Sequence, residues 1–271
     1  MNKIKILDIE IDGIETKSLV ERLASLASNM SSGPIRAIQV NPEIIVAANY
    51  SESINKLVRS ADFKLANGAG IQWAANYNKQ AKKSFFQLVK SLFKIFTQPK
   101  HGQDQIPELF NSSSFTEVLL NKLSEQKSKV LIAASPKRSN IDDSLAFLRN
   151  KHQGLDLIGF DSGNFDEQSL LDLTALVKTS SPDLVLLGLG FPLQESVAEK
   201  LKSEISHGAI VTEGGTFDYE SFGGKVKRAP KIFQSIGLEW FWRLAKEPVR
   251  LKRQLALLEF IKLVYRKNKM H

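Results

Sequence analysis

The chain has 271 residues, no cysteine and a formal net charge of +8. This length suffices for one large α/β domain or for a domain with an appendage. The missing thiols exclude cysteine nucleophiles, disulfides and cysteine-rich metal sites. The first residues mix charged and apolar side chains, unlike a signal peptide, and no apolar run is long enough to span a membrane. We therefore expect a cytoplasmic protein that is soluble or peripheral to a membrane.

The positive charge is concentrated in two segments. Residues 63–103 contain seven lysines and no acidic residue, and residues 243–271 contain nine lysines or arginines against two glutamates. Such clusters can serve phosphate groups, anionic lipid or nucleic acid. Aromatic residues lie on the apolar stripes of these segments rather than between the basic residues, so we expect no nucleic-acid binding.

Five short runs rich in branched apolar residues are separated by segments of helical length. They cover residues 35–40, 130–134, 155–160, 184–189 and 209–212. Strands that alternate with helices predict an α/β fold with a mostly parallel sheet and helices on both faces. Ligands bind such sheets at the carboxyl ends of the strands. Candidate functional residues are therefore sought in the loops that follow these runs.

Two predicted helices are both amphipathic and basic. The first lies in a segment at about residues 79–100, and its apolar stripe is Phe85, Leu88, Val89, Leu92, Phe93 and Phe96. The second starts at Pro248 and continues to about Lys267, and its stripe is Leu251, Leu255, Leu258, Ile261 and Tyr265. A stripe of this kind can pack on the protein core or lie in an anionic membrane interface. Both alternatives stay open for the first helix.

Glycine-rich turns follow the last two predicted strands. Gly188-Leu189-Gly190 precedes Pro192-Leu193-Gln194-Glu195, and Glu213-Gly214-Gly215 precedes Thr216-Phe217-Asp218. Glycines allow a backbone to approach a ligand, and a helix that begins after Pro192 offers N–H groups to a phosphate. Tight strand-to-helix connections explain the same turns. The scattered histidines and the lack of a phosphate-binding or dinucleotide fingerprint lead us to expect no metal and no cofactor.

Together these loops resemble the WecG/TagA/CpsF family, glycosyltransferase family 26. The resemblance is closest in residues 181–195, 214–218, 227–230 and 237–253, and is weaker in residues 41–43, 61–62 and 67–74. It implies a Rossmann-like core over residues 1–212, interrupted by the insert at 79–100. It also implies a membrane-facing loop and helical appendage over residues 213–271.

The resemblance implies an inverting transferase of cell-surface polysaccharide synthesis. The enzyme would move an N-acetylmannosamine-like sugar from a UDP-sugar to a polyprenyl-diphosphate-linked acceptor, on the anionic inner face of the cell membrane. Self-association stays open. We expect the arginines, whose planar fork suits phosphate, to neutralise the diphosphate. The implied substrate-binding residues are Asn41, Gly68, Gly190, Gln194, Glu195, Gly214, Gly215, Phe217, Asp218, Arg228, Arg243, Arg250 and Arg253.

The chain departs from the family pattern at the position of the candidate base. The family expects aspartate where this chain has Asn67, and an asparagine side chain can only hydrogen-bond. The family arginine near Gln105 is missing as well. One hypothesis is an active transferase that uses another base, Asp62, or that relies on electrostatic stabilisation of the leaving UDP. The alternative is a non-catalytic sugar-nucleotide-binding homologue or scaffold at the membrane.

Overall fold

The computed structural model describes residues 2–27, 29, 33–80, 84–97, 105–135, 140–227, 229–230, 242 and 251–269. Within them lies an eight-stranded sheet with the strand order β1-β2-β4-β3-β8-β7-β5-β6. Only β1 and β2 pair antiparallel, so the predicted α/β fold with a mostly parallel sheet is confirmed. The strands are β1 (Asn2–Ile6), β2 (Ile9–Gly13), β3 (Ile35–Val40), β4 (Phe63–Ala66), β5 (Lys129–Ala134), β6 (Asp156–Asp161), β7 (Leu184–Gly188) and β8 (Ala209–Thr212).

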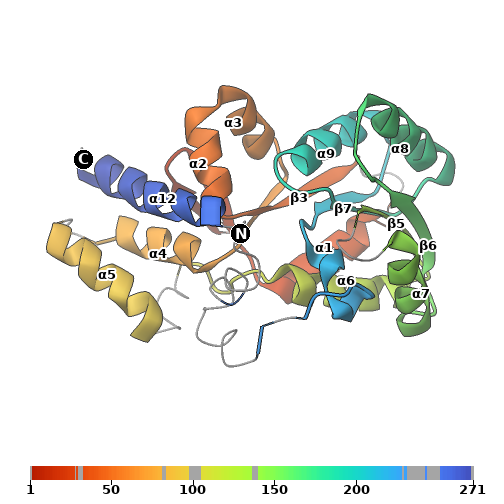
Figure 1. Ribbon diagram of the computed structural model, residues 1–271, viewed down its shortest axis with the longest axis horizontal. Helices are drawn as coiled ribbons and strands as arrows, with labels where there is room; N and C mark the ends of the chain where they lie inside the picture. Colours follow the sequence, from red (N-terminus) through yellow and green to blue (C-terminus); the bar gives the residue numbers. More distant parts are fainter. Residues whose placement is uncertain are drawn as a thin grey trace.

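Helices cover both faces of the sheet (Figure 1). One face packs on α1 (Thr16–Ala27), α6 (Ser112–Glu125) and α7 (Ile141–Lys151). The other face packs on α2 (Pro42–Tyr50), α4 (Ala69–Asn78), α8 (Glu167–Ser180) and α9 (Leu193–Glu204), with α3 (Glu52–Arg59) beside α9. The sheet is therefore buried on both sides, as a parallel sheet requires.

Three strands were missed by the sequence prediction. In β1 and β2 the buried isoleucines Ile4, Ile6, Ile9 and Ile11 alternate with exposed or charged residues, which is the period of a half-buried strand. The two strands are joined by a short turn, so their pattern runs together in the sequence. Strand β4 has only four residues, all buried, and such a short run cannot be separated from its flanking helices by periodicity.

The C-terminal helix α12 (Leu251–Lys269) packs on α2 and α4 through a face that only partly coincides with the predicted stripe. Phe260 and Val264 are buried, whereas Leu255 and Leu258 of the predicted stripe are 59% and 65% exposed. Ile261 and Tyr265 of the predicted stripe are partly buried and pack on the core. The stripe is thus confirmed for these two residues and wrong for Leu255 and Leu258, because apolar residues occupy two adjacent faces of this helix and spacing alone does not choose between them. Tyr50 of α2 also donates a hydrogen bond to Glu259.

The helix in the lysine-rich segment, α5 (Phe85–Thr97), turns only part of its apolar stripe toward the protein. Leu88 and Ser91 are buried, and Ser91 accepts a 2.8 Å hydrogen bond from the indole N–H of Trp73 on α4. The side chains of Phe85 and Phe93 are 68% and 67% exposed. One side of the predicted apolar stripe is therefore buried against the protein, and the other side is exposed to solvent. Among the described residues, no helix is long and apolar enough to cross a membrane.

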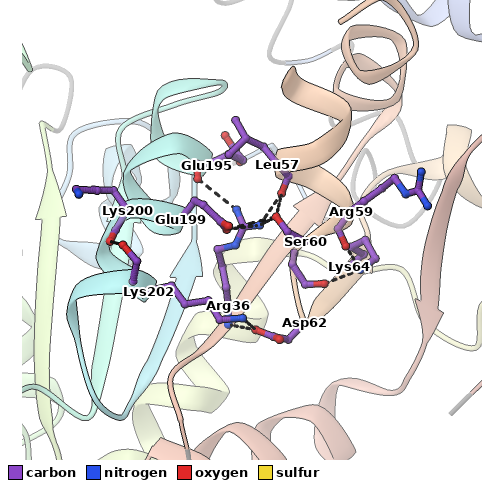
Figure 2. A network of polar contacts seen from close by, with 12 residues as sticks. Arg36, Leu57, Arg59, Ser60, Asp62, Lys64, Glu195, Glu199, Lys200 and Lys202 are labelled. Carbon is purple, nitrogen blue, oxygen red and sulfur yellow. Dashed lines mark hydrogen bonds and ion pairs between the residues drawn. The ribbon is translucent and has the colours of Figure 1, made fainter. Parts of the chain in front are cut away.

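A buried arginine ties β3 to α3 and α9 at the amino end of the sheet (Figure 2). The Arg36 side chain is fully buried and forms a 2.9 Å ion pair with Glu199. Its guanidinium also donates to the main-chain oxygens of Leu57 and Glu195 and to the hydroxyl of Ser60. Because a buried charge is costly without such partners, this network holds the three elements in one arrangement.

We predict that Arg36→Met lowers the free energy of unfolding by about 3–5 kcal/mol, because it removes a fully buried guanidinium together with its ion pair and its three hydrogen bonds. Urea unfolding of the full chain measures this difference. The matched control is Lys56→Met, which breaks an exposed ion pair with Glu52 and is expected to cost less than about 1 kcal/mol. Equal effects of the two substitutions would contradict the structural role of Arg36.

Candidate functional site

A cavity of about 400 Å³ opens where five parallel strands end. Parallel strands place all their carboxyl ends at one edge, so loops far apart in sequence meet there. From the first half of the chain, the cavity is lined by residues at the end of β3 and the start of α2 (Gln39, Asn41, Glu43 and Ile44), by Asn67 after β4 and by Ser112 on α6. From the second half, it is lined by Ser135 after β5, by residues at the end of β7 and in the segment that follows (Gly188–Phe191 and Gln194), and by residues at the end of β8 and in the segment that follows (Thr212–Gly215 and Asp218).

Gln194, in the first turn of α9, joins the two glycine-rich loops. Its side-chain oxygen accepts hydrogen bonds from the main-chain N–H of Gly190 at 3.2 Å and of Gly214 at 3.0 Å. Both glycines have positive φ angles, 79° and 57°, which L-residues with side chains rarely adopt. The two glycines therefore allow the backbone conformation of the loops, and the Gln194 amide fixes the distance between the loops.

The Gln194 amide nitrogen donates to Glu195 at 2.9 Å, behind the cavity wall. Glu195 is 1% exposed, and burial raises the pKa of its carboxyl to about 7, an effect that the Gln194 hydrogen bond opposes. Phe217 is also buried and packs edge-on against Phe222 at 5.9 Å between ring centroids. Neither Glu195 nor Phe217 is among the described residues that line the cavity. Both support its wall from behind.

On the opposite wall, the amide of Asn67 is held by Gln39. Asn67 Nδ2 donates to Gln39 Oε1 at 2.8 Å, and the Ser112 hydroxyl donates to the same oxygen. The main-chain N–H of Asn67 continues the sheet ladder to the carbonyl of Val40. The side chain of Asn67 is thus fixed with its nitrogen toward Gln39. It can position a ligand but cannot take up a proton.

Glu213 is the first residue after β8 and lies 3% exposed in the cavity wall. Its Oε2 accepts a 3.0 Å hydrogen bond from the Thr216 hydroxyl, while Oε1 has no hydrogen-bond partner among the described residues. Burial raises the pKa of Glu213 to about 8, and the side chains of Thr116, Thr216 and Gln39 oppose this shift. The carboxyl is therefore mostly protonated and uncharged near neutral pH.

The structure brings only some of the other predicted site residues together. Asn41 caps α2 by accepting a 3.0 Å hydrogen bond from the N–H of Ile44, and it lines the cavity with Gly215 and Asp218. Gly68 forms the N-cap of α4 with a φ of 93°, beside Asn67 but outside the lining.

Asp62 lies at the other end of the sheet. It precedes β4 and accepts hydrogen bonds from the Arg36 main-chain N–H at 2.7 Å and from Lys202 at 2.6 Å (Figure 2). The cavity is at the carboxyl end of β4, so a side chain before the amino end of that strand cannot reach a ligand there. Asp62 thus stabilises the amino edge of the sheet.

The predicted arginine ligands fall outside this description. Arg228, Arg243 and Arg250 lie outside the described residues, as does the side chain of Arg253. Among the described residues, the cavity lining contains three carboxyl groups, on Glu43, Glu213 and Asp218, and no lysine or arginine. A diphosphate bound here needs positive charge from elsewhere in the chain, and an uncharged Glu213 reduces the repulsion that it meets.

Several cavity residues were missed by the sequence reasoning. Gln39, Ser112, Thr212 and Glu213 are absent from the implied ligand set but line the cavity. Thr212 ends a predicted strand, Glu213 follows it, and Gln39 is the second-last residue of another. Their positions at the carboxyl ends of predicted strands could therefore have identified them as candidate cavity residues. Ser112 comes from α6, and nothing in its local sequence indicates that it lies at this edge.

Comparison with known proteins gives consistent results. The sequence model of the Glycosyl transferase WecG/TagA/CpsF family matches residues 4–103 and 99–271. A relative from Bacillus spizizenii is 26% identical over 261 residues, which is 96% of this chain and 88% of that protein. It is described as an N-acetylglucosaminyldiphosphoundecaprenol N-acetyl-beta-D-mannosaminyltransferase.

The raised pKa of Glu213 predicts a pH-dependent stability. Its pKa is about 8 when folded, against an ordinary value of 4.5. The stabilisation is fully present below about pH 4.5, where both states hold the proton, and is lost as the pH rises through about 8. Relative to Glu213→Gln, we expect the wild type to lose roughly 4 kcal/mol of unfolding free energy over this range.

Urea unfolding of both proteins at about pH 5 and about pH 8.5 measures the change. The control is Glu204→Gln, because Glu204 is an ion-paired surface carboxylate whose pKa lies at about 2. That substitution is expected to give the same difference at both pH values. A difference between wild type and Glu213→Gln that does not vary with pH would contradict the buried, protonated state.

Proposed function

The chain belongs to the WecG/TagA/CpsF family of glycosyl transferases, and on this premise we propose that it transfers an N-acetylmannosamine-like sugar from a UDP-sugar to a polyprenyl-diphosphate-linked acceptor. The Bacillus spizizenii relative carries a name that specifies such an acceptor. The observation that carries the proposal is the cavity itself, because family motifs from both halves of the chain line one space at the carboxyl edge of the sheet.

The cavity has the features that a sugar nucleotide needs. Its volume of about 400 Å³ lies within the usual range for small-molecule sites. Gly190 and Gly214 let the main chain come close to a ligand, while the amides of Asn41 and Asn67 offer hydrogen-bonding groups for hydroxyls. We assign the donor diphosphate to the glycine loops and the neutralisation of its charge to the arginines that the family resemblance implies, Arg228, Arg243, Arg250 and Arg253.

We propose a single in-line displacement, which inverts the anomeric carbon. The acceptor hydroxyl oxygen forms a new bond to that carbon as the bond from the carbon to the UDP oxygen breaks. UDP leaves with the electron pair, and the hydroxyl proton must pass to a base in the cavity. Positive charge near the diphosphate stabilises the leaving group. The residues from the described part of the chain contribute positioning and proton transfer.

Gln194→Leu is predicted to weaken UDP binding at least about tenfold. The substitution removes the acceptor shared by Gly190 and Gly214, and each unpaired polar group costs about 1–3 kcal/mol. Isothermal titration with UDP measures the affinity. The control, Gln168→Leu, removes an exposed amide that donates to Asp172 and is expected to bind UDP like the wild type. If the wild type releases or absorbs no heat on titration with millimolar UDP, the proposed UDP site is contradicted.

We propose further that the protein works peripherally on the anionic inner leaflet of the cell membrane, with α5 as the contact. The helix presents an uncovered apolar face formed by Phe85, Phe86, Val89 and Phe93. Lys90 is exposed next to this face, and residues 63–103 contain no acidic side chain. An apolar face flanked by lysines fits the boundary of an anionic leaflet. A lipid-linked acceptor has to be met at that surface.

The double substitution Phe86→Ser/Phe93→Ser is predicted to lower partitioning onto phosphatidylglycerol-containing vesicles by at least about tenfold, because each phenylalanine contributes about 1.5–3 kcal/mol when buried. Vesicle flotation of the full chain measures it. Leu171→Ser is the control, since Leu171 on α8 is also an exposed apolar side chain, at 59% against 74% for Phe86 and 67% for Phe93. Unchanged flotation of the double variant would exclude α5 as the membrane contact.

A further inference from the structure

We propose that Glu213 accepts the proton of the acceptor hydroxyl, the role that the amide at position 67 cannot fill. This inference rests on the transfer reaction proposed above and adds the identity of its base. Glu213 lines the cavity and is buried in its wall. Among the described residues its oxygen Oε1 has no partner in hydrogen-bond geometry, although the side chains of Thr116 and Gln39 lie close enough to lower the pKa of the carboxyl. A buried oxygen in this state calls for an explanation, and a hydroxyl group bound against this wall would supply the missing partner.

The strand register explains why Glu213 and Asn67 share one site. In the sheet, Ala37 of β3 pairs with Val211 of β8, so Gln39 and Glu213, two residues further on, reach the same level and face. Gln39 pairs on its other side with Leu65 of β4, and Asn67 follows two residues later. Three neighbouring strands thus place an amide, a second amide and a carboxyl side by side. The hydrogen bond from Asn67 to Gln39 fixes one end of this row.

The other carboxyl groups are less suited to the role. Among the described residues that line the cavity, the remaining titratable groups are Glu43 on α2 and Asp218 in the short helix Thr216–Asp218, while β3, β7, α6 and α9 contribute uncharged side chains. Neither Glu43 nor Asp218 belongs to the row that contains Asn67. Asp62, at the far edge, is excluded by distance along the strand.

The chemistry balances without any further reactant. Ionised Glu213 takes the hydroxyl proton through Oε1 while the acceptor oxygen bonds to the anomeric carbon and UDP leaves with the electrons of the broken bond. The proton then returns to solvent when the products leave. Because the pKa of Glu213 is about 8, roughly a tenth of the molecules carry the ionised form near pH 7. A base with a pKa close to the working pH is the efficient choice for proton transfer.

The test is a transfer assay on the full chain with UDP-N-acetylmannosamine and a short-chain N-acetylglucosaminyl-diphosphate lipid, between about pH 6 and about pH 9.5. We expect the wild-type kcat/KM to rise with pH and to level off above about 8. In Glu213→Gln it is expected to fall by about 10² to 10⁴ and to lose this rise. UDP affinity, measured by titration, should stay within about threefold, and Glu204→Gln should behave as wild type.

A second variant separates loss of the carboxyl from loss of structure. Asn67→Asp in the Glu213→Gln background restores a carboxylate in the same row and is expected to recover at least about tenfold of the lost rate. A Glu213→Gln enzyme as active as the wild type at every pH overturns the role of Glu213 and leaves the transferase function intact. Absence of wild-type transfer, despite normal UDP binding, overturns the proposed function and the role of Glu213 with it.

Discussion

The pairing of β3 with β8 is the contact on which the site depends. It joins a strand from the first forty residues to the last strand of the sheet, with Ala37 opposite Val211. On one side of this seam lie β4 and the loop that holds Asn67, and on the other lie β7 and the glycine loops. Without it the two halves of the chain would present separate sheet edges. With it, their loops enclose one cavity.

The two edges of the sheet each contain a buried ionisable side chain, and the two side chains differ in their charge state. At the amino edge, the terminal nitrogens of the buried Arg36 meet four partners, which compensate its charge while it links β3 to α3 and α9. At the carboxyl edge, Glu213 accepts a hydrogen bond from Thr216 and has no cationic side chain among the causes that shift its pKa, so burial holds it largely uncharged. The amino edge is therefore held in one arrangement by the network around Arg36. The other edge keeps a proton that a ligand can exchange, since a carboxyl in this state is poised near neutral pH.

Periodicity and turn chemistry were enough for much of the fold. Five of the eight strands in the described part of the chain, and their parallel arrangement, follow from the spacing of branched residues. The glycine pairs Gly188/Gly190 and Gly214/Gly215 indicated the correct edge of the sheet. The four-residue β4 and the contact faces of α5 and α12 could not be predicted. Those faces depend on which neighbouring helix buries which side of an apolar surface, and the sequence of one helix does not contain that information.

For the site, sequence reasoning found the residues that belong to recognisable motifs, such as Asn41, Gln194 and Gly214. It did not find Gln39, Ser112 or Glu213, because they reach the cavity through the register between strands and through the packing of α6. It also suggested Asp62 from its nearness in sequence to Asn67, although a strand separates them and carries them to opposite edges. Residues at the two ends of one strand are close in sequence but lie at opposite edges of the sheet. Because ligands bind only at the carboxyl edge, only one of the two can reach them.

The arrangement of donor and base is the central claim, and a crystal structure with bound UDP tests it most directly. The account predicts the diphosphate against the loops at Gly190 and Gly214, with its terminal phosphate turned toward the row formed by Asn67, Gln39 and Glu213. The anomeric carbon of a bound sugar would then lie within reach of an acceptor oxygen held by Glu213. UDP bound outside this cavity, or with its terminal phosphate directed away from Glu213, would contradict the account.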